Sequence, residues 1–231
     1  MKTLRILSGG AAQGLVESVR PAFEARNGGT IDGVFGAVGA MKARLLSGEP
    51  ADLLILSHAL VDELAHVGHV VPATIRDIGA VPTSVALRSG DKPPPLATAD
   101  DLRTALRAAG EIHFPDPELA TAGIHFAKVL RELGLWDQLA SRLRTAPNGA
   151  AAMRALAAST SRHPIGCTQA TEILSTPGIV LAADLPPGCA LATTYTCGVT
   201  SHAAAPLEAA ALIALLTREA DRDARRRLGF A

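Results

Sequence analysis

A short apolar run, a loop of very small residues and then a helical pattern follow one another twice near the start of the chain. The first copy runs from residues 4–7 into Ser8-Gly9-Gly10-Ala11, and the second from residues 31–35 into Gly36–Ala40. Such loops let a ligand approach backbone N–H groups at a helix N-terminus, where the helix dipole favours an anion. Small loops also permit close packing of a strand on a helix, so one copy alone decides little. The pair favours an anion-binding site.

The alternation continues through a third strand and helix. Residues 53–56 form a continuous apolar run, which is typical of a strand covered on both faces. We expect strands at 4–7, 30–35 and 53–56, and helices at 11–26, 39–47 and 59–67. This order predicts a parallel, doubly wound α/β sheet, which binds ligands at the carboxyl ends of its strands.

A second α/β unit is expected after an extended segment at residues 78–88. The expected helices are 99–109, 120–133, a short helical piece at 135–143, 149–158 and 168–174. The expected strands are 112–114, 164–167, 179–183 and 189–196, followed by a long helix at 203–217. We therefore predict two doubly wound lobes joined by a two-strand hinge. Residues 1–82 with 196–231 would form lobe I, residues 83–195 would form lobe II, and a ligand cleft would lie between the lobes.

Charge and composition narrow the class of partner. The 231 residues contain 22 Lys+Arg and 22 Asp+Glu, giving a net charge of +0, whereas nucleic acids and anionic membranes attract basic proteins. No stretch approaches the ~20 apolar residues of a membrane span. We expect a small anionic molecule as the partner and no nucleic acid, and the sequence carries no signal for an oligomeric state. The mixed-charge segment 218–227 is expected to be a solvated helix end.

No metal or cofactor is expected. The three cysteines, Cys167, Cys189 and Cys197, lack the Cys-x-x-Cys spacing of zinc sites, and their odd number does not fit a disulfide framework. The histidines also lack the spacing of metal ligands. We expect the thiols to be free, and we expect neither a bound metal nor a cofactor.

The first residues bear on location. A secretory signal needs an apolar region of ~7–15 residues, whereas Met1-Lys2-Thr3 runs into a shorter apolar segment that already fits a strand. We expect a cytoplasmic protein. The alternative is a periplasmic protein whose signal peptide has been removed.

Several motifs resemble the molybdate-type periplasmic binding proteins of ABC transporters. In the first lobe these are residues 15–23, Gly36-Ala37-Val38-Gly39-Ala40 and the segment 46–54 that contains Gly48-Glu49-Pro50-Ala51-Asp52. In the second lobe they are Pro115-Asp116-Pro117, residues 123–130 and Leu133-Gly134-Leu135-Trp136-Asp137. The resemblance covers nearly the whole chain and implies the type II periplasmic-binding-protein fold.

The same resemblance exposes two departures. Members of that family hold a tetrahedral oxyanion with a serine in the first loop and another in a Gly-Ala-Ser-Gly turn. Here Val38 stands at the second position, and Ala11 aligns with the first serine while Ser8 lies three residues earlier. Each missing donor in a buried site costs about 1–3 kcal/mol. An apolar Val38 instead favours a ligand with a carbon skeleton.

The resemblance also includes an enzyme branch similar to aconitate isomerase, which moves a proton along an allylic tricarboxylate. Residues 120–126 and 165–174 are closer to that branch. The resemblance therefore implies an isomerase acting on an unsaturated di- or tricarboxylate such as aconitate. Two alternatives stay open: the substrate-binding protein of a molybdate-type transporter, and an anion sensor without chemistry.

The candidate site residues follow from these corners. His125 and Ser8 are the candidate catalytic residues, because a histidine has a reference pKa of ~6.5 that suits proton transfer and a serine can relay a proton. Packing of His125, or loop closure by Ser8, is the alternative for each. Gln169 is a possible donor to the ligand, and Glu172 a surface salt-bridge residue. The candidate substrate-binding residues are Gly9, Gly10, Ala11, Ala37, Val38, Gly39, Thr121, Ala122, Gly123, Gln169 and Tyr195.

Overall fold

The computed structural model describes residues 3–231, which divide into two compact α/β units. Unit 1 comprises Met1–Ala80 and Thr193–Ala231, and unit 2 comprises Val81–Ala192. The chain passes between the units twice, once within strand β4 (Arg76–Arg88) and once at the start of strand β9 (Ala192–Val199). Both crossings lie slightly before the boundaries expected from the sequence.

Unit 1 is built on three parallel strands with one antiparallel neighbour. The strands are β1 (Thr3–Gly9), β2 (Thr30–Gly36) and β3 (Leu53–Ser57), and the order is β2-β1-β3-β9. β1 pairs in parallel with β2 and β3, whereas β9 pairs with β3 in the antiparallel direction. The side chains of residues 53–56 are fully buried because helices cover both faces of this sheet.

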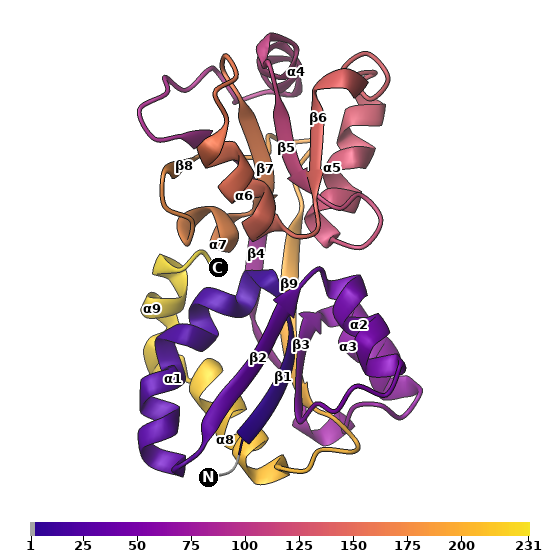
Figure 1. Cartoon of the computed structure of the whole chain (residues 1–231), viewed down its shortest axis with the longest axis vertical. Coiled ribbons are helices and arrows are strands. Elements are labelled where there is room, and N and C mark those ends of the chain that lie inside the picture. The colour runs from indigo at the N-terminus through magenta and orange to yellow at the C-terminus, as the bar shows by residue number, and fades with distance from the viewer. Residues whose placement is uncertain (1–2) are drawn as a thin grey trace. The chain divides into compact units, whose positions relative to one another are not determined.

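The helices of unit 1 follow its strands in chain order. They are the 3-10 turn η1 (Gly10–Ala12), α1 (Gln13–Asn27), α2 (Val38–Leu46), α3 (His58–His66), η2 (Pro72–Thr74), α8 (Pro206–Leu216), η4 (Glu219–Asp221) and α9 (Arg222–Arg227). Helices α1 and α8 lie on one face of the sheet, and α2 and α3 lie on the other (Figure 1). Each parallel strand therefore delivers the chain to a helix N-terminus at the same edge of the sheet.

A buried carboxylate ties together the amino-terminal ends of unit 1. Asp52, just before β3, accepts the backbone N–H of Arg5 through Oδ2 at 2.8 Å. Its Oδ1 accepts the N–H groups of Ala204 and Ala205 at 2.7 and 2.9 Å, just before α8. Hydrogen bonds from three N–H groups offset the cost of burying this charge. Asp52 thus joins the two parts of the chain that make up the unit.

Unit 2 has a mixed sheet of five strands. They are β4, β5 (Ile112–Pro115), β6 (Leu143–Ala146), β7 (Ile165–Gln169) and β8 (Ile179–Asp184). The order is β4-β7-β5-β6, with β8 also paired to β4. β5 is parallel to β6 and β7, whereas β4 runs antiparallel to β7 and β8.

The helices of unit 2 pack on this sheet, and a small aromatic cluster joins α5 to it. They are α4 (Ala99–Ala108), α5 (Thr121–Glu132), the 3-10 turn η3 (Ala140–Arg142), α6 (Gly149–Ala158) and α7 (Ala170–Leu174). The ring of Phe114 meets that of Phe126 edge-on, with centroids 5.4 Å apart, and that of Trp136 at 6.3 Å. Arg131 lies over the Trp136 ring at 4.3 Å, a cation–π contact. This cluster fixes β5 against α5.

The α/β alternation predicted from the sequence is confirmed, with two local corrections. Residues 135–143 are not a helix: turns and η3 lead into β6, which pairs with β5 from Ile112↔Leu143 onward. The segment 218–227 is not wholly solvated, because Arg225 is buried and donates from Nη1 to the carbonyl of Arg218 at 2.6 Å. At residue 143 the pairing of β6 with β5 outweighs the local pattern, and in 218–227 one arginine folds back on its own segment.

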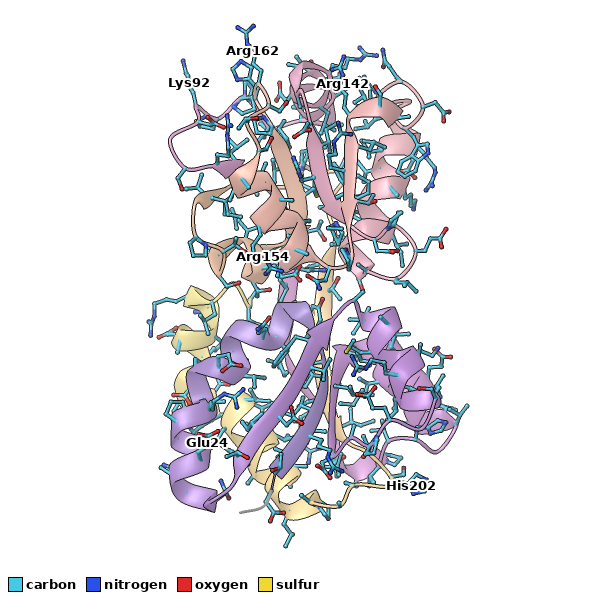
Figure 2. The ribbon with its side chains drawn as sticks, viewed as in Figure 1. Glu24, Lys92, Arg142, Arg154, Arg162 and His202 are labelled. Carbon is cyan, nitrogen blue, oxygen red and sulfur yellow. The ribbon has the colours of Figure 1, made fainter. Side chains whose placement is uncertain are left out.

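Among residues 3–231 no helix is both long enough and apolar enough to cross a membrane. Charged side chains are distributed over both units. The labelled cations Arg142 and Arg162 of unit 2 come just before β6 and β7, at the amino ends of these strands, and Lys92 lies in the loop after β4 (Figure 2). These cations are therefore not at the carboxyl ends of the parallel strands of unit 2.

Candidate functional site

Several of the helix N-termini at the carboxyl ends of strands have no side-chain cap among residues 3–231, although Asn148 caps α6 after β6. Within the part of the chain that the structure describes, no side chain caps η1, α2, α3 or α5, whose N-cap residues are Gly9, Ala37, Ser57 and Ala120. By contrast, Thr98 and Asp101 form a reciprocal capping box on α4. The first N–H groups of an uncapped helix lack an intrahelical acceptor, so they remain available to an anion.

In unit 1 the two small-residue corners lie against each other, and Tyr195 from β9 joins them. A Cβ atom at Gly9 would lie 2.9 Å from both Tyr195 Cε1 and Val38 Cγ1, which is closer than real Cβ contacts. Only glycine therefore fits without displacing these side chains. The predicted residues Gly9, Val38 and Tyr195 share one corner, with a backbone floor and an apolar and aromatic wall. We call these three residues the Gly9 corner.

The other predicted residues of unit 1 surround the Gly9 corner. Gly10 and Ala11 form η1, Ala37 is the N-cap of α2, and Gly39 is in its first turn. Ser8 is 0% exposed, and its hydroxyl donates to the carbonyl of Gly9 at 2.9 Å. This bond holds the loop, as in the alternative stated for Ser8 above.

In unit 2 the predicted residues Thr121, Ala122 and Gly123 form the first turn of α5. Asp116 Oδ1 folds the preceding loop by accepting the N–H groups of Glu118 and Leu119 at 2.8 and 2.9 Å. Gly123 lies against this loop so closely that a Cβ atom would be 2.1 Å from the carbonyl oxygen of Asp116. The uncapped N-terminus of α5 thus lies directly on the carboxyl end of β5.

His125 lies one turn further along α5, where it makes a hydrogen bond within unit 2. Its Nε2 is 2.7 Å from the carbonyl oxygen of Cys189. Because a carbonyl can only accept, Nε2 carries the proton in this contact, and Nδ1 is the remaining basic nitrogen. The bond attaches α5 to the turn before β9, which fits the packing alternative. A catalytic role for His125 stays a prediction.

The last predicted residue, Gln169, ends β7 and is buried. It lies opposite Thr83 in the antiparallel pairing of β4 and β7. Thr83 Oγ1 and Thr171 Oγ1 are also buried, and neither has a hydrogen-bond partner within residues 3–231. The carboxyl end of β7 is thus a polar region inside unit 2. The sequence analysis missed Thr83, because only the pairing of distant strands brings it to Gln169, and it did not single out Thr171 within residues 165–174.

Glu172 was expected on the surface, but it is only 5% exposed. Its Oε2 accepts the Thr168 hydroxyl at 2.6 Å, and its carboxylate accepts N–H groups of Ala150, Gln169 and Gly149. Burial raises the pKa of Glu172, and these four hydrogen bonds act in the opposite direction. Ala150 and Gly149 belong to the first turn of α6. The N-terminus of α6 is therefore filled by a carboxylate of the chain itself and is not offered to a ligand.

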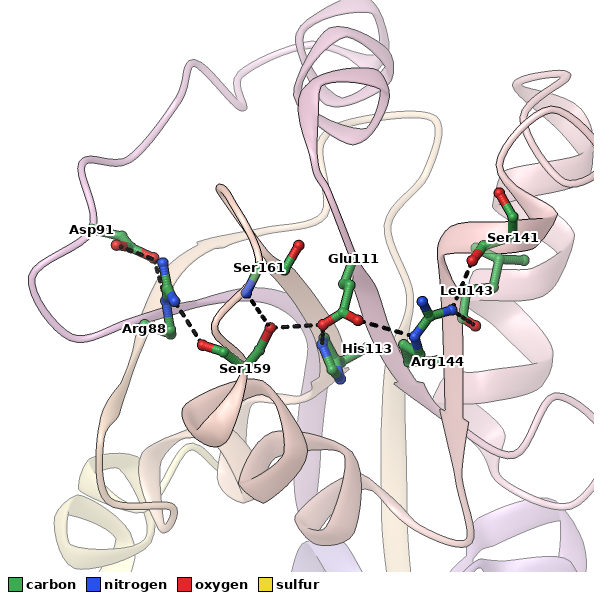
Figure 3. Close-up of polar contacts among 9 residues, drawn as sticks. All are labelled: Arg88, Asp91, Glu111, His113, Ser141, Leu143, Arg144, Ser159 and Ser161. Atoms are coloured by element: carbon green, nitrogen blue, oxygen red, sulfur yellow. Dashed lines mark hydrogen bonds and ion pairs between the residues drawn. The ribbon is translucent and has the colours of Figure 1, made fainter.

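A second polar cluster lies at the other end of unit 2, where β5 begins. Glu111 Oε2 accepts the Ser159 hydroxyl at 2.7 Å and His113 Nε2 at 3.2 Å, and its Oε1 is 3.1 Å from Arg144 Nε (Figure 3). Burial lowers the pKa of His113, although Glu111 acts in the opposite direction. These residues link β5, β6 and the segment after α6, so we interpret the cluster as structural.

Metal binding has no evident site in the described chain. No group of three or more His, Cys, Asp or Glu side chains within residues 3–231 is placed to hold a metal ion. The cysteines are free and buried, and burial raises the pKa of the Cys197 thiol to about 12. A thiol held neutral in this way is a poor metal ligand and a poor nucleophile.

Together, two α/β units crossed twice by the chain and backbone donors at strand ends define a binding protein of the type II periplasmic-binding-protein fold. The chain belongs to the family described as bacterial extracellular solute-binding protein, whose family model matches residues 4–231. The resemblance inferred from the motifs is therefore confirmed.

Known proteins similar to this chain include an aconitate isomerase and binding proteins for molybdate and sulfate. An aconitate isomerase of a Pseudomonas species is 26% identical over 223 residues, which are 93% of this chain and 82% of that protein. The periplasmic molybdate-binding protein of Azotobacter vinelandii has a TM-score of 0.78 at 17% identity, covering 99% of this chain and 98% of that one. The sulfate-binding protein of Mycobacterium tuberculosis has a TM-score of 0.76 at 16% identity, covering 100% and 86%. These structures share the fold.

Proposed function

We propose that this protein binds a small organic carboxylate and isomerises an unsaturated di- or tricarboxylate such as aconitate. The Gly9 corner carries the proposal, because it places an apolar side chain and an aromatic ring beside uncapped backbone donors. Backbone N–H groups suit a carboxylate, whereas the Val38 and Tyr195 side chains suit the carbon atoms that carry it. The similarity to an aconitate isomerase over 93% of the chain supports the same class of substrate.

The reaction requires a base and stabilised charge, and nothing is oxidised or reduced. The base removes a proton from the methylene carbon next to the double bond, and the electron pair delocalises over three carbons and the attached carboxylates. Return of the proton to the far carbon of this allylic system moves the double bond. Donors fixed at helix N-termini stabilise the anionic intermediate without reorganising. Proton transfer by a positioned group typically contributes ~10²–10⁴-fold.

Binding of a molybdate-type oxyanion is the second candidate. Uncapped helix N-termini at β1 and β2 of unit 1 would serve a tetrahedral oxyanion as well as a carboxylate. However, Val38 and Ala11 offer no hydroxyl where the resemblance places serines, and the Ser8 hydroxyl is bonded to Gly9. A non-catalytic sensor of organic anions would use the same donors as the isomerase.

Two measurements on the full chain separate these functions. The first is a thermal-shift panel of trans-aconitate, citrate, molybdate and sulfate, since a ligand that binds only the folded state raises the Tm by mass action. The second is incubation with trans-aconitate, following the ratio of isomers by chromatography. We expect a Tm increase with tricarboxylates and formation of the cis isomer. Stabilisation by molybdate alone would support a receptor, and stabilisation by tricarboxylates without turnover would support a sensor.

A further inference from the structure

A histidine, an aspartate and a threonine from three different elements of unit 1 form a hydrogen-bonded group that the site described above does not include. His58 is the first residue of α3, Asp77 lies near the start of β4, and Thr196 is in β9. His58 Nδ1 lies 2.9 Å from Asp77 Oδ1, and the Thr196 hydroxyl donates to the same oxygen at 2.5 Å. The topology of the sheet, not the local sequence, brings these residues together.

The geometry fixes which nitrogen of His58 is free to act as a base. A carboxylate only accepts, so Nδ1 must carry the proton that it shares with Asp77, and the neutral ring then has its lone pair on Nε2. The Thr196 Oγ1 is 3.3 Å from Nδ1, and Thr196 is 0% exposed, so a buried threonine contacts both His58 and Asp77. The side chain of His58 is nevertheless 57% exposed. An imidazole whose Nδ1 is hydrogen-bonded to an aspartate and whose other edge is exposed has the arrangement of a general base oriented by that aspartate.

His58 also lies at the same edge of the unit 1 sheet as the Gly9 corner. It directly follows Ser57, the last residue of β3, and Ser57 lies opposite Tyr195 in the β3–β9 register. Tyr195 in turn contacts Gly9. The candidate base therefore follows a strand end whose partner residue is already part of the proposed binding corner.

The charges around His58 favour its protonated form. The hydrogen bond and the charge of Asp77 raise the pKa of His58, Asp62 on the same helix adds to this, and burial opposes it slightly. Burial would raise the pKa of Asp77, but the hydrogen bonds from Thr196 and His58 outweigh it, so the pKa of Asp77 is lowered. The nearby Arg76 is turned to the carbonyls of Ala73 and Ile75. A histidine tuned in this way accepts a proton and keeps it long enough to return it.

We propose that His58 is the catalytic base, which removes the allylic proton of the substrate through Nε2 and returns it to the far allylic carbon. Asp77 and Thr196 are positioning residues that hold the ring in one tautomer. The proposal rests on the proposed isomerase function. One imidazole serves both steps: the proton removed from one carbon is balanced by a proton returned to the other, which the exposed ring can exchange with solvent in between, and the substrate's electron pair moves without any redox partner.

The test uses the full chain with trans-aconitate and compares His58→Gln with His66→Gln. His66 is an exposed histidine at the end of the same helix, so it is a matched control. We expect His58→Gln to lower kcat by ~100-fold or more and His66→Gln to leave it unchanged, with both variants melting like the wild type. Exchange of substrate protons in D₂O, followed by NMR, should disappear only in His58→Gln.

Asp77→Asn tests whether Asp77 tunes His58, because a purely structural contact between the two residues would not change the pH profile. Loss of the carboxylate should lower kcat and move the acidic limb of the kcat/KM profile to lower pH, because the pKa of His58 then falls. The inference would be overturned if the wild type turns over and His58→Gln retains more than a third of its kcat; the proposed function would then still stand. In that case, loss of activity in His125→Gln would assign the base to His125. A wild type that neither isomerises nor exchanges any unsaturated acid would overturn both.

Discussion

The Glu172 carboxylate accepts the Thr168 hydroxyl at 2.6 Å and so closes the start of α7 onto the end of β7. The same carboxylate accepts N–H groups from the first turn of α6, which lies more than a dozen residues earlier in the chain. Helix N-termini are the donors that an anion can use in such a fold, and here the N-terminus of α6 is occupied by the carboxylate of Glu172. Glu172 thus limits the ligand donors of unit 2 to those of α5 and the end of β7.

Glu172→Gln should destabilise the protein by about 1–3 kcal/mol, because a glutamine offers one acceptor oxygen and turns an NH₂ group towards backbone N–H donors. The matched control is Glu118→Gln, since Glu118 is exposed in the loop before α5. Urea unfolding of both variants measures the difference. Equal midpoints for the two variants would show that Glu172 does not cap α6.

Thr98→Ala should lower the free energy of unfolding by about 1 kcal/mol. The Thr98 hydroxyl accepts the N–H of Asp101 at 3.1 Å, and Asp101 Oδ2 accepts the N–H of Thr98 at 3.0 Å. Thr104→Ala changes an exposed threonine in the interior of α4, where alanine is the better helix former, so it should be neutral or stabilising. Chemical denaturation compares them, and an equal loss in both would contradict the capping box.

The sequence predicts those parts of the fold and site that local pattern controls. Small-residue loops followed by apolar spacing of four marked both corners of unit 1, because strand ends and helix starts are decided within a few residues. The helix predicted at residues 135–143 is wrong. Leu135, Leu139 and Leu143 have helical spacing, but Leu143 begins β6, whose pairing with β5 decides the structure there. The role of Glu172 was equally hidden, since two of its four partners, Gly149 and Ala150, belong to another helix that the fold packs against α7.

The sequence alone also could not show which histidine, His58 or His125, is the better candidate for the base. His58, Asp77 and Thr196 are far apart in the chain, and none has a motif around it that signals catalysis. They meet because β9 returns to pair with β3 and because the chain reaches β4 beside them. His125, by contrast, follows a small-residue corner and therefore stood out, although its ring bonds to a backbone carbonyl. The surroundings of His58 depend on strand pairing between distant parts of the chain, and the sequence pattern alone does not show them.

His113 should contribute a loss of stability as the pH drops below about 7, whereas His58, whose pKa is raised, acts in the opposite direction. Burial lowers the pKa of His113 below its ordinary value of 6.5, so the unfolded chain binds more protons in this range. The contribution is present above the unfolded pKa and is lost as the pH falls through the folded one. Glu111, whose pKa is lowered mainly by the Ser159 hydroxyl, acts in the same direction below its ordinary value of 4.5.

His113→Asn removes the titrating ring from the cluster in Figure 3, and the Tm should then depend less on pH between 5.5 and 7 than it does in the wild type. His66→Gln is the control, since His66 is exposed and should leave the pH dependence unchanged. Calorimetry at four pH values gives the slopes. Identical slopes in the wild type and His113→Asn would assign the effect to other groups.

Val38 should decide whether the Gly9 corner prefers a carbon skeleton or an inorganic oxyanion. Val38→Ser removes apolar surface and supplies a hydroxyl at the N-terminus of α2, beside the backbone of Gly9. We expect binding of trans-aconitate to weaken by about tenfold, equivalent to ~1.4 kcal/mol, and binding of molybdate to strengthen. Val38→Ala separates the two effects, because it loses the same apolar contact without gaining a donor: it should weaken the organic ligand and leave molybdate unchanged. Isothermal titration with each ligand gives the affinities, and if both variants kept the wild-type preference, then Val38 would be a packing residue and the ligand would be selected elsewhere.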